Sequence, residues 1–274
     1  MIKISEKLSQ DENSGVIVPC VLRLANAESF TNKVSAIFLM SAIFDKAGVH
    51  QETLRKYKKH NRRKFIDLCV DDTPMIKRAV AHHIGVLASK MSVDTYLKEM
   101  MPIFKKLTTD DLDTVRILCI ESLVRISLTM TKDLNKKHMI PILIQMTRDK
   151  AWKVRSNMAL NFVKISKALG SEITDNSLVN IFSSLIQDPE GDVRKEAVMN
   201  FAGFVKLVSP DKLPTVLQSV NGMTADSLSL VRVGIYDILG HIAKNSPKDL
   251  IKTKVLPQLI EALKKETDTE ARIE

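Results

Sequence analysis

The stretch DKAWKVRSN, which begins at Asp149, is one of six copies of a pattern that recurs along the 274 residues. Each copy starts with an acid, passes a small or branched apolar residue five positions later, and reaches Arg or Lys at the sixth position. The other copies are DDTPMIKRA from Asp71, DDLDTVRIL from Asp110, DPEGDVRKE from Asp188, DSLSLVRVG from Asp226 and ETDTEARIE from Glu266. The six acids are spaced by 39, 39, 39, 38 and 40 residues. Such regular spacing predicts an array of structural repeats.

Proline provides a second marker, in phase with the first. It occurs in similar apolar segments around five positions: Pro19, Pro102, Pro141, Pro214 and Pro257. Asn180 stands where the fifth repeat should carry its proline. We predict that the proline bends the first helix of each unit, because it lacks the N–H of a helical hydrogen bond.

Between the two markers the apolar residues have helical spacing. In VRSNMALNFVKISKAL they form a broad apolar stripe that includes Val154, Met158, Leu160, Phe162, Val163, Ile165 and Leu169. Each unit is therefore predicted to be a pair of helices. A pair of this kind cannot bury both faces alone, so the units should stack into a solenoid.

The acid of each copy should lie in the short turn before the second helix, where a carboxylate accepts amide protons and meets the positive end of the helix dipole. The basic residue lies at that same end and needs an acidic partner, for which the nearest source is the neighbouring repeats. We therefore predict a ladder between turns. Its members are Asp71, Asp110, Arg116, Asp149, Asp188, Arg194, Asp226, Arg232, Glu266 and Arg272, together with Arg155.

The predicted fold class is all-α, an α-α superhelix of about seven two-helix repeats forming a single solenoid over residues 1–274. The approximate repeats are 15–47, 50–91, 93–131, 133–170, 173–208, 210–245 and 247–274. Terminal repeats of a solenoid present a polar outer face, which Ile273 does not provide. We expect the chain to be the middle of a longer array.

Composition agrees with an ordered helical protein, with 45% hydrophobic and 27% charged residues and few Gly or Pro. No segment is long and apolar enough to span a bilayer, and the N-terminus lacks the apolar region of a signal peptide, which predicts a cytoplasmic or nuclear setting. Cys20, Cys69 and Cys119 fit reduced core thiols better than a disulfide framework. The formal net charge of +9 could favour nucleic acid, an anionic membrane or an acidic protein.

These repeats resemble HEAT repeats. LCVDDTPMIKRA, residues 68–79, and DKAWKVRSNMALNFVKISKALGSEIT, residues 149–174, closely resemble the scaffolding A subunits of protein phosphatase 2A. The resemblance extends to IVPCVLRLANAESFTNKVSA, which begins at Ile17. The family carries arginine where this chain has Lys77.

The resemblance implies a non-catalytic scaffold whose ridge of turns within the repeats binds a regulatory B subunit. It implies binding of the catalytic subunit only if the chain continues beyond Glu274. The partner-binding residues that it implies are Phe30, Thr31, Asp72, Thr73, Pro74, Lys77, Arg78, Asp113, Ala151, Trp152, Lys153, Arg155 and Glu190. Trp152 stands between two lysines and is interpreted as an exposed anchor, since Trp and Arg are enriched among interface hot spots. The alternative is that Trp152 folds back onto its own helix pair.

The basic run RKYKKHNRRK, residues 55–64, offers a different hypothesis, in which the chain is a HEAT-repeat adaptor of transport or nucleic-acid-binding type. A solvated helix face is the simpler interpretation, because Leu54, Tyr57, Phe65 and Leu68 supply an apolar side. His82 and His83 diverge on a helix and have no further ligands at metal-binding spacing. The paired acids recur with the repeat, as caps do, so we predict no catalytic residue, metal or cofactor and do not expect a nucleic-acid or membrane partner.

Overall fold

The computed structural model describes residue 3 and residues 7–9, 12–44 and 51–266, apart from the side chains of residues 14, 51–56 and 265. Within those ranges the regular structure is entirely helical, with no strand. The chain divides into two compact units, Met1–Met130 and Thr131–Glu274. The predicted all-α class is confirmed.

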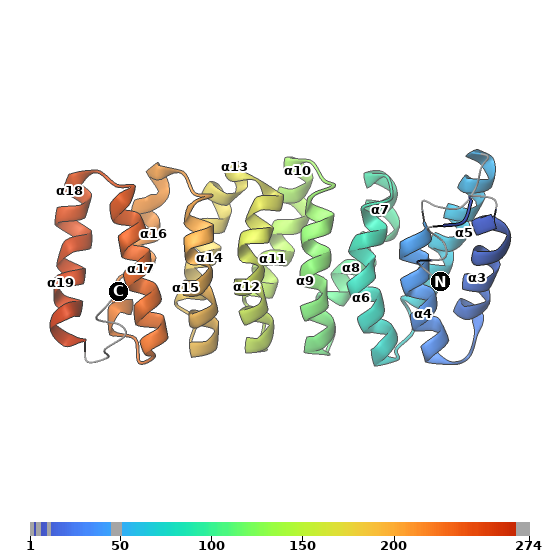
Figure 1. Ribbon diagram of the computed structural model, residues 1–274, viewed down its shortest axis with the longest axis horizontal. Helices are drawn as coiled ribbons and strands as arrows, with labels where there is room; N and C mark the ends of the chain where they lie inside the picture. Colours follow the sequence, from blue (N-terminus) through green and yellow to red (C-terminus); the bar gives the residue numbers. More distant parts are fainter. Residues whose placement is uncertain (1–2, 4–6, 10–11, 45–50, 267–274) are drawn as a thin grey trace. The chain divides into compact units, whose positions relative to one another are not determined.

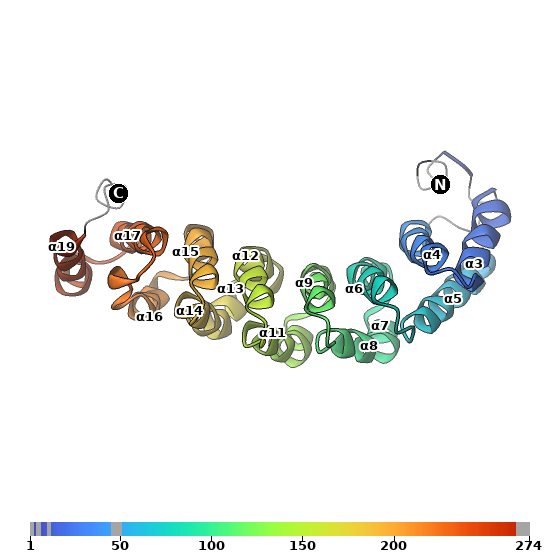
Figure 2. The same cartoon turned by 90° about the horizontal axis from the view of Figure 1, so that it is seen from below.

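The first unit contains three helix pairs (Figure 1). They are α3 (Val18–Asn26) with α4 (Phe30–Ile43), α5 (Gln51–Leu68) with α6 (Pro74–Ala88), and α7 (Val93–Glu99) and α8 (Met101–Leu107) with α9 (Asp113–Ser127). Helices α4, α6 and α9 pack side by side in one layer, and α3, α5 and α8 lie in the other (Figure 2). The second helix of each pair therefore lies beside its counterparts in the adjacent repeats.

The second unit repeats this plan. Its pairs are α10 (Lys132–Leu134) and α11 (Ile140–Thr147) with α12 (Trp152–Leu169), α13 (Ser171–Ile173) and α14 (Val179–Ile186) with α15 (Gly191–Val205), and α16 (Leu213–Ser219) with α17 (Ser229–Lys244). Helices α18 (Lys248–Leu250) and α19 (Leu256–Lys265) begin a further pair, of which Arg272 and Ile273 lie outside the described residues. In Figure 2, α12, α15 and α17 form one layer, and α11, α14 and α16 form the other.

The first helix of most pairs is interrupted one or two residues before the proline position. In the fourth repeat a π-helical turn, Asn135–Met139, joins α10 to α11, and the Ile140 N–H donates to the carbonyl five residues back. Proline then occupies the first turn of α11, where its missing N–H costs little. The same turn forms at Thr174–Leu178, although the marker position that follows holds Asn180. The interruption therefore does not depend on proline.

Each core lies between the two layers of its unit. In the second unit it is rich in phenylalanine, with Phe162 and Phe182 ring centroids 4.8 Å apart and Phe182 and Phe204 centroids 4.4 Å apart. Leu160, expected in the apolar stripe of α12, is instead 50% exposed. It lies about 200° around the helix from both Met158 and Phe162, which are buried. The prediction was wrong for this residue.

No described helix is long and apolar enough to cross a membrane. The three cysteines are free thiols, of which Cys119 is fully buried and Cys20 and Cys69 are partly exposed. Burial raises the pKa of the Cys119 thiol far above its ordinary value.

Candidate protein-interaction ridge

In five repeats the acid shapes the turn before the second helix. Its carboxylate accepts a hydrogen bond from the backbone N–H of the residue two positions later, which is the N-cap of the second helix. The distances are 3.0 Å for Asp71, 3.0 Å for Asp110, 2.8 Å for Asp149, 2.9 Å for Asp188 and 2.9 Å for Asp226. The hydrogen bond closes an Asx-turn, in which the Asp side chain replaces a backbone acceptor and holds the chain in a fixed bend.

In the second unit the arginine six positions after the acid joins two consecutive turns. Arg155 Nη1 donates to the carbonyl of Asp149 at 2.7 Å, within its own turn. Its Nε and Nη2 donate to the two carboxylate oxygens of Asp188 at 2.7 and 2.9 Å. Such bidentate pairing is stronger and more directional than a single charged hydrogen bond. Each arginine thus fixes the position of one turn against the next.

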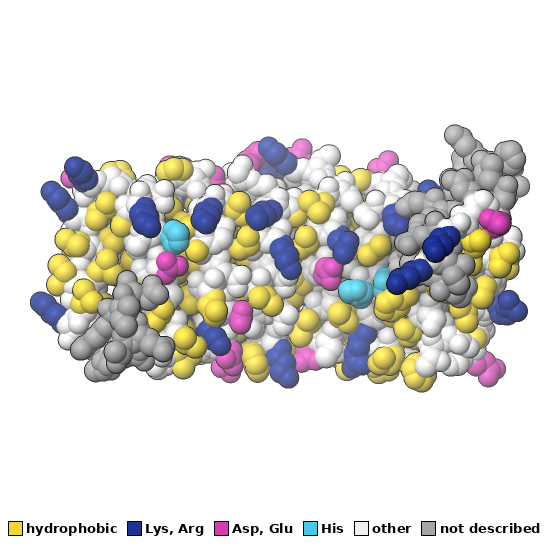
Figure 3. Space-filling model, viewed as in Figure 1, with side chains coloured by type: hydrophobic (Ala, Val, Ile, Leu, Met, Phe, Trp, Pro, Cys, Tyr) yellow, Lys and Arg dark blue, Asp and Glu magenta, His cyan; other side chains and the backbone are white. Residues whose placement is uncertain are grey.

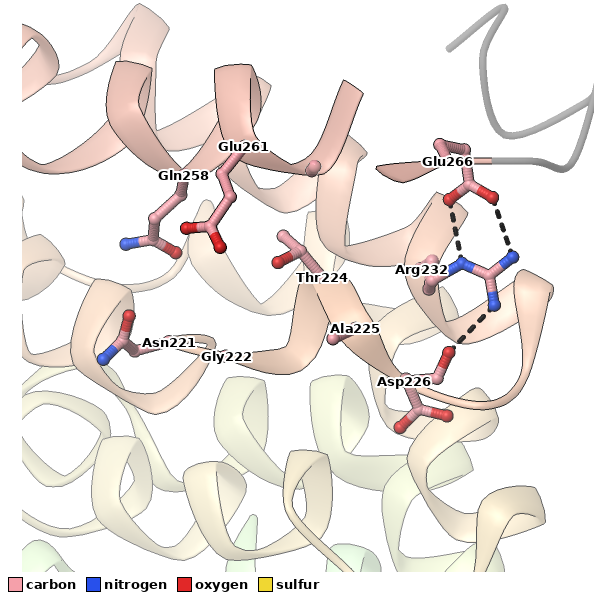
Figure 4. A pocket seen from close by; sticks show the side chains of 10 residues that line it. Asn221, Gly222, Thr224, Ala225, Asp226, Arg232, Gln258, Glu261 and Glu266 are labelled. Carbon is pink, nitrogen blue, oxygen red and sulfur yellow. Dashed lines mark hydrogen bonds and ion pairs between the residues drawn. The ribbon is translucent and has the colours of Figure 1, made fainter. Parts of the chain in front are cut away.

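The same arrangement occurs twice more in this unit. Arg194 donates to the Asp188 carbonyl at 2.9 Å and to both carboxylate oxygens of Asp226 at 2.6 and 3.0 Å. Arg232 donates to the Asp226 carbonyl at 2.8 Å and to both oxygens of Glu266 at 2.8 Å (Figure 4). Burial raises the pKa of Asp226, but the hydrogen bonds from Arg194 and the Leu228 N–H outweigh it and leave the pKa lowered.

In the first unit lysines make the contacts between consecutive turns, although the sixth position after Asp110 holds an arginine, Arg116. Lys33 Nζ lies 2.8 Å from Asp71, and Lys77 Nζ lies 3.1 Å from Asp110 and 3.4 Å from Asp72. The hydrogen bond from Lys33, with those from Thr73, lowers the pKa of Asp71 to about 2. Arg116 is buried and donates to the carbonyls of Asp110 and Asp111 at 2.6 and 3.1 Å.

The residues that the turns expose differ from those that hold them. Trp152 is the first residue of α12, next to the capping residue Ala151, and its side chain is 39% exposed. Lys153 Nζ lies 5.9 Å from the centre of the indole ring, within range of a cation–π contact. Arg155 points inward to Asp188, whereas Trp152, Lys153 and Glu190 reach solvent. The second unit therefore presents an aromatic surface set among charges.

The first unit presents a smaller aromatic surface. Phe30, the first residue of α4, is 46% exposed, and its neighbour Thr31 is exposed as well. Asp72 and Pro74 are exposed at the start of α6, whereas Lys77 is held by carboxylates. The remaining residues of the turns are partly buried: Thr73 caps α6, Arg78 Nε donates to the Thr114 hydroxyl at 3.1 Å, and Asp113 begins α9.

Some residues of the turns were not among the sequence predictions. Met75, Leu228 and Leu230 are exposed at helix starts, and Lys33 completes the first ion pair. The segment around Lys33, SFTNKVSA, has no acid six positions before the lysine. The interval of 38 residues between Lys33 and Asp71 is also longer than the 33 between Arg155 and Asp188, so the sequence held no spacing signal for this pair.

The basic run forms part of α5. Lys58 lies 5.3 Å over the Phe44 ring, Arg62 pairs with Glu99, and Lys64 Nζ lies 3.8 Å from Asp67. Tyr57, Phe65 and Leu68 are buried, while the side chains of Leu54, Arg55 and Lys56 lie outside the described part of the chain. The arrangement agrees with a solvated helix face.

The two histidines have separate surroundings. His83 is buried and shares a hydrogen bond of 2.8 Å with the Ser41 hydroxyl, whereas His82 is partly exposed and 3.8 Å from Glu121. Burial, with His82 and Arg125 nearby, lowers the pKa of His83 to about 4. Among the described residues no group of three His, Cys, Asp or Glu is placed to hold a metal ion.

No family model matches the chain. The PP2A regulatory A subunit of Schizosaccharomyces pombe is 31% identical over 122 residues, 44% of this chain and 20% of that protein. The protein of the same name in Saccharomyces cerevisiae is 30% identical over 127 residues, 44% of this chain and 19% of that protein. The matched region spans about a fifth of the length of these relatives. Over that region the resemblance to the A subunits is confirmed.

Solved structures agree on the fold. A chain from the structure describing Kap95p binding to RanGDP superposes with a TM-score of 0.69 at 15% identity, over 97% of this chain and 35% of that chain. Cex1p superposes with a TM-score of 0.61 at 14% identity, over 93% of this chain and 46% of that one. These likenesses confirm the predicted α-solenoid class and carry no information on partners.

Proposed function

We propose that this chain is a non-catalytic scaffold of a protein phosphatase 2A-type serine/threonine phosphatase, and that its ridge of turns binds a regulatory B subunit. The observation that carries the proposal is the exposure of Trp152 at the start of α12, within a chain that resembles regulatory A subunits. An aromatic side chain held on a rigid turn loses little conformational entropy when it binds a partner.

The ladder supports this proposal because the residues that fix the turns are different from the exposed residues that would contact a partner. Arg155 and the acids of the turns pair with one another, so the exposed side chains between them are kept in fixed positions. Trp152 and Lys153 offer an aromatic and a cationic contact, and Glu190 offers an acidic one. A partner with an apolar pocket and mixed charges around it would match this surface.

The test is to titrate the chain with a purified regulatory B subunit, then separately with the catalytic subunit. Trp152→Ala should weaken binding of the regulatory partner about 30-fold, the equivalent of about 2 kcal/mol for loss of a hot-spot side chain. Isothermal titration calorimetry measures the two dissociation constants directly.

Leu128→Ala is the matched control, because Leu128 is an exposed apolar residue at the far end of α9 from the turns. Its binding should equal that of the unchanged chain. Equal losses in both variants, or a complete lack of binding to the regulatory partner, would contradict the proposal. Strong binding to nucleic acid that falls steeply with salt would favour the basic-adaptor alternative instead.

A further inference from the structure

The exposed face of the second layer in unit 2 carries a row of lysines that the turn ridge does not include. Lys167, Lys206 and Lys244 are exposed and each lies twelve residues after a ladder arginine. They occupy equivalent places near the C-terminal ends of α12, α15 and α17, which pack side by side. Figure 3 shows basic side chains aligned across these three helices.

These lysines are available to a partner. In the part of the chain that the structure describes, no carboxylate pairs with Lys167, Lys206 or Lys244. A cation near the C-terminus of a helix also stabilises that helix by interacting with its dipole. This effect acts within each helix and does not account for the alignment of the three lysines across helices. Repetition in one register places the three charges on a line.

The spacing of the row restricts the anion that can match it. Neighbouring packed helices have axes about 8–10 Å apart. A polyproline II segment has three residues per turn and rises about 3.1 Å per residue, so every third side chain falls on one side, about 9 Å apart. An extended segment with an acid at every third position would therefore place one carboxylate at each lysine.

The surroundings of the row favour a protein over a nucleic acid. Leu160 and Met199 lie seven residues before Lys167 and Lys206, on the same side of their helices, and are 50% and 66% exposed. At the equivalent place α17 carries an exposed acid, Asp237. Apolar side chains and a carboxylate beside the row offer contacts to a peptide, whereas a phosphate backbone gains nothing from the first and is repelled by the second.

We propose that this lysine row, Lys167, Lys206 and Lys244, binds an extended acidic segment of a partner protein with acids three residues apart. The site lies on the helix face rather than on the turns, so it goes beyond the scaffold function proposed above. Binding there should not require Trp152.

The experiment uses the full chain and a fluorescein-labelled peptide of repeating Glu-Pro-Pro units, followed by fluorescence anisotropy. Changing all three lysines to Gln should weaken binding about tenfold, since each exposed ion pair contributes modestly. The triple Lys→Arg variant should retain binding. Circular dichroism checks that the variants are folded, and single Lys→Gln variants, each with a partial loss, replace the triple variant if it is not.

The matched control changes Lys137, Lys252 and Lys264 to Gln, because these are also exposed lysines of unit 2 and the net charge changes equally. Its affinity for the peptide should stay within about twofold of the unchanged chain, as should that of Trp152→Ala. Equal weakening in the control, or equal binding of a peptide with its Glu residues clustered at one end, would overturn the proposal. So would a single-stranded oligonucleotide that binds the row more tightly than the peptide.

Discussion

The contacts that join consecutive turns are made by different cations in the two units. In unit 2, Arg155, Arg194 and Arg232 each contact the backbone of their own turn and grip both oxygens of the next acid. In unit 1, Arg116 likewise contacts the backbone of its own turn, but the contacts from one turn to the next come from lysines: Lys33 reaches one oxygen of Asp71, and Lys77 reaches one oxygen of Asp110 and one of Asp72. A guanidinium offers several donors in a fixed plane, whereas an ammonium is a point charge on a flexible stem. The turns of unit 2 are therefore more tightly defined relative to one another.

Burial differs in the same direction. The side chains of Asp188 and Asp226 are each 5% exposed, while that of Asp71 is 19% exposed. A buried charge depends strongly on its partner, because its hydration has been lost. The arginine contacts should thus matter more to stability than the lysine contacts.

The largest expected effect is from Asp188→Asn. The amide oxygen can still accept the Glu190 N–H, but the charge that pairs with Arg155 is lost and the guanidinium remains partly buried. We expect unit 2 to lose about 3 kcal/mol of unfolding free energy, measured by urea denaturation.

Asp71→Asn is the matched change in unit 1 and should cost about 1 kcal/mol or less, since its ion pair is better solvated. Amide hydrogen exchange near each turn assigns the loss to its unit. Equal losses in the two variants would contradict the distinction between the units.

A second difference concerns pH. His83 is six residues after Lys77, and the same register in unit 2 holds Asn161, Asn200 and Ile238, none of which titrates. The folded pKa of His83, about 4, lies below its ordinary 6.5, so the unfolded chain binds more protons between these values. The contribution of His83 is full above about pH 6.5 and is lost as the pH falls toward about 4. Urea denaturation over that range should show unit 1 weakening while unit 2 changes little.

His83→Gln should remove this dependence, because an amide can bond Ser41 without titrating. Asp71 titrates lower: its folded pKa of about 2 lies below the ordinary 3.8, so its contribution is lost only as the pH falls from about 3.8 toward 2. Persistence of the change between pH 6.5 and 4 in His83→Gln would assign it to another group.

The repeated sequence predicts this fold well because each signal occurs several times. The roles of the acid and of the arginine six residues later can be predicted from the helix dipole. An acid is favoured at the N-terminal end of the second helix, whereas an arginine there needs an acidic partner. The repeat also accounts for the interval between Arg155 and Asp188, which belong to consecutive turns. A single copy would not have distinguished a ladder from a pair of isolated caps.

Other features depend on geometry that composition does not encode. Leu160 fits an apolar stripe by residue type, yet its angle on α12 places it in solvent. Asn180 removes the proline marker, yet the π-helical turn before it is retained. Among the exposed residues of the ridge, Leu228 and Leu230 have no distinguishing sequence signal, since Val154 and Val193 are also apolar residues in the first turn of a helix and are buried.

The smallest expected effects come from exchanging the two cations. Arg155→Lys keeps the charge but cannot reach the Asp149 carbonyl and both oxygens of Asp188 at once, so unit 2 should lose about 1 kcal/mol. Lys77→Arg should stabilise unit 1 by less than about 1 kcal/mol, because the new guanidinium could grip Asp110 with two donors. Urea denaturation measures both changes.

Arg78→Lys is the control, since Arg78 donates to the Thr114 hydroxyl outside the ladder. Its free energy of unfolding should change little. A loss in Arg78→Lys as large as that in Arg155→Lys would mean that arginine stabilises these helices wherever it lies. The bidentate contact of the guanidinium with Asp188 would then not explain the difference between the units.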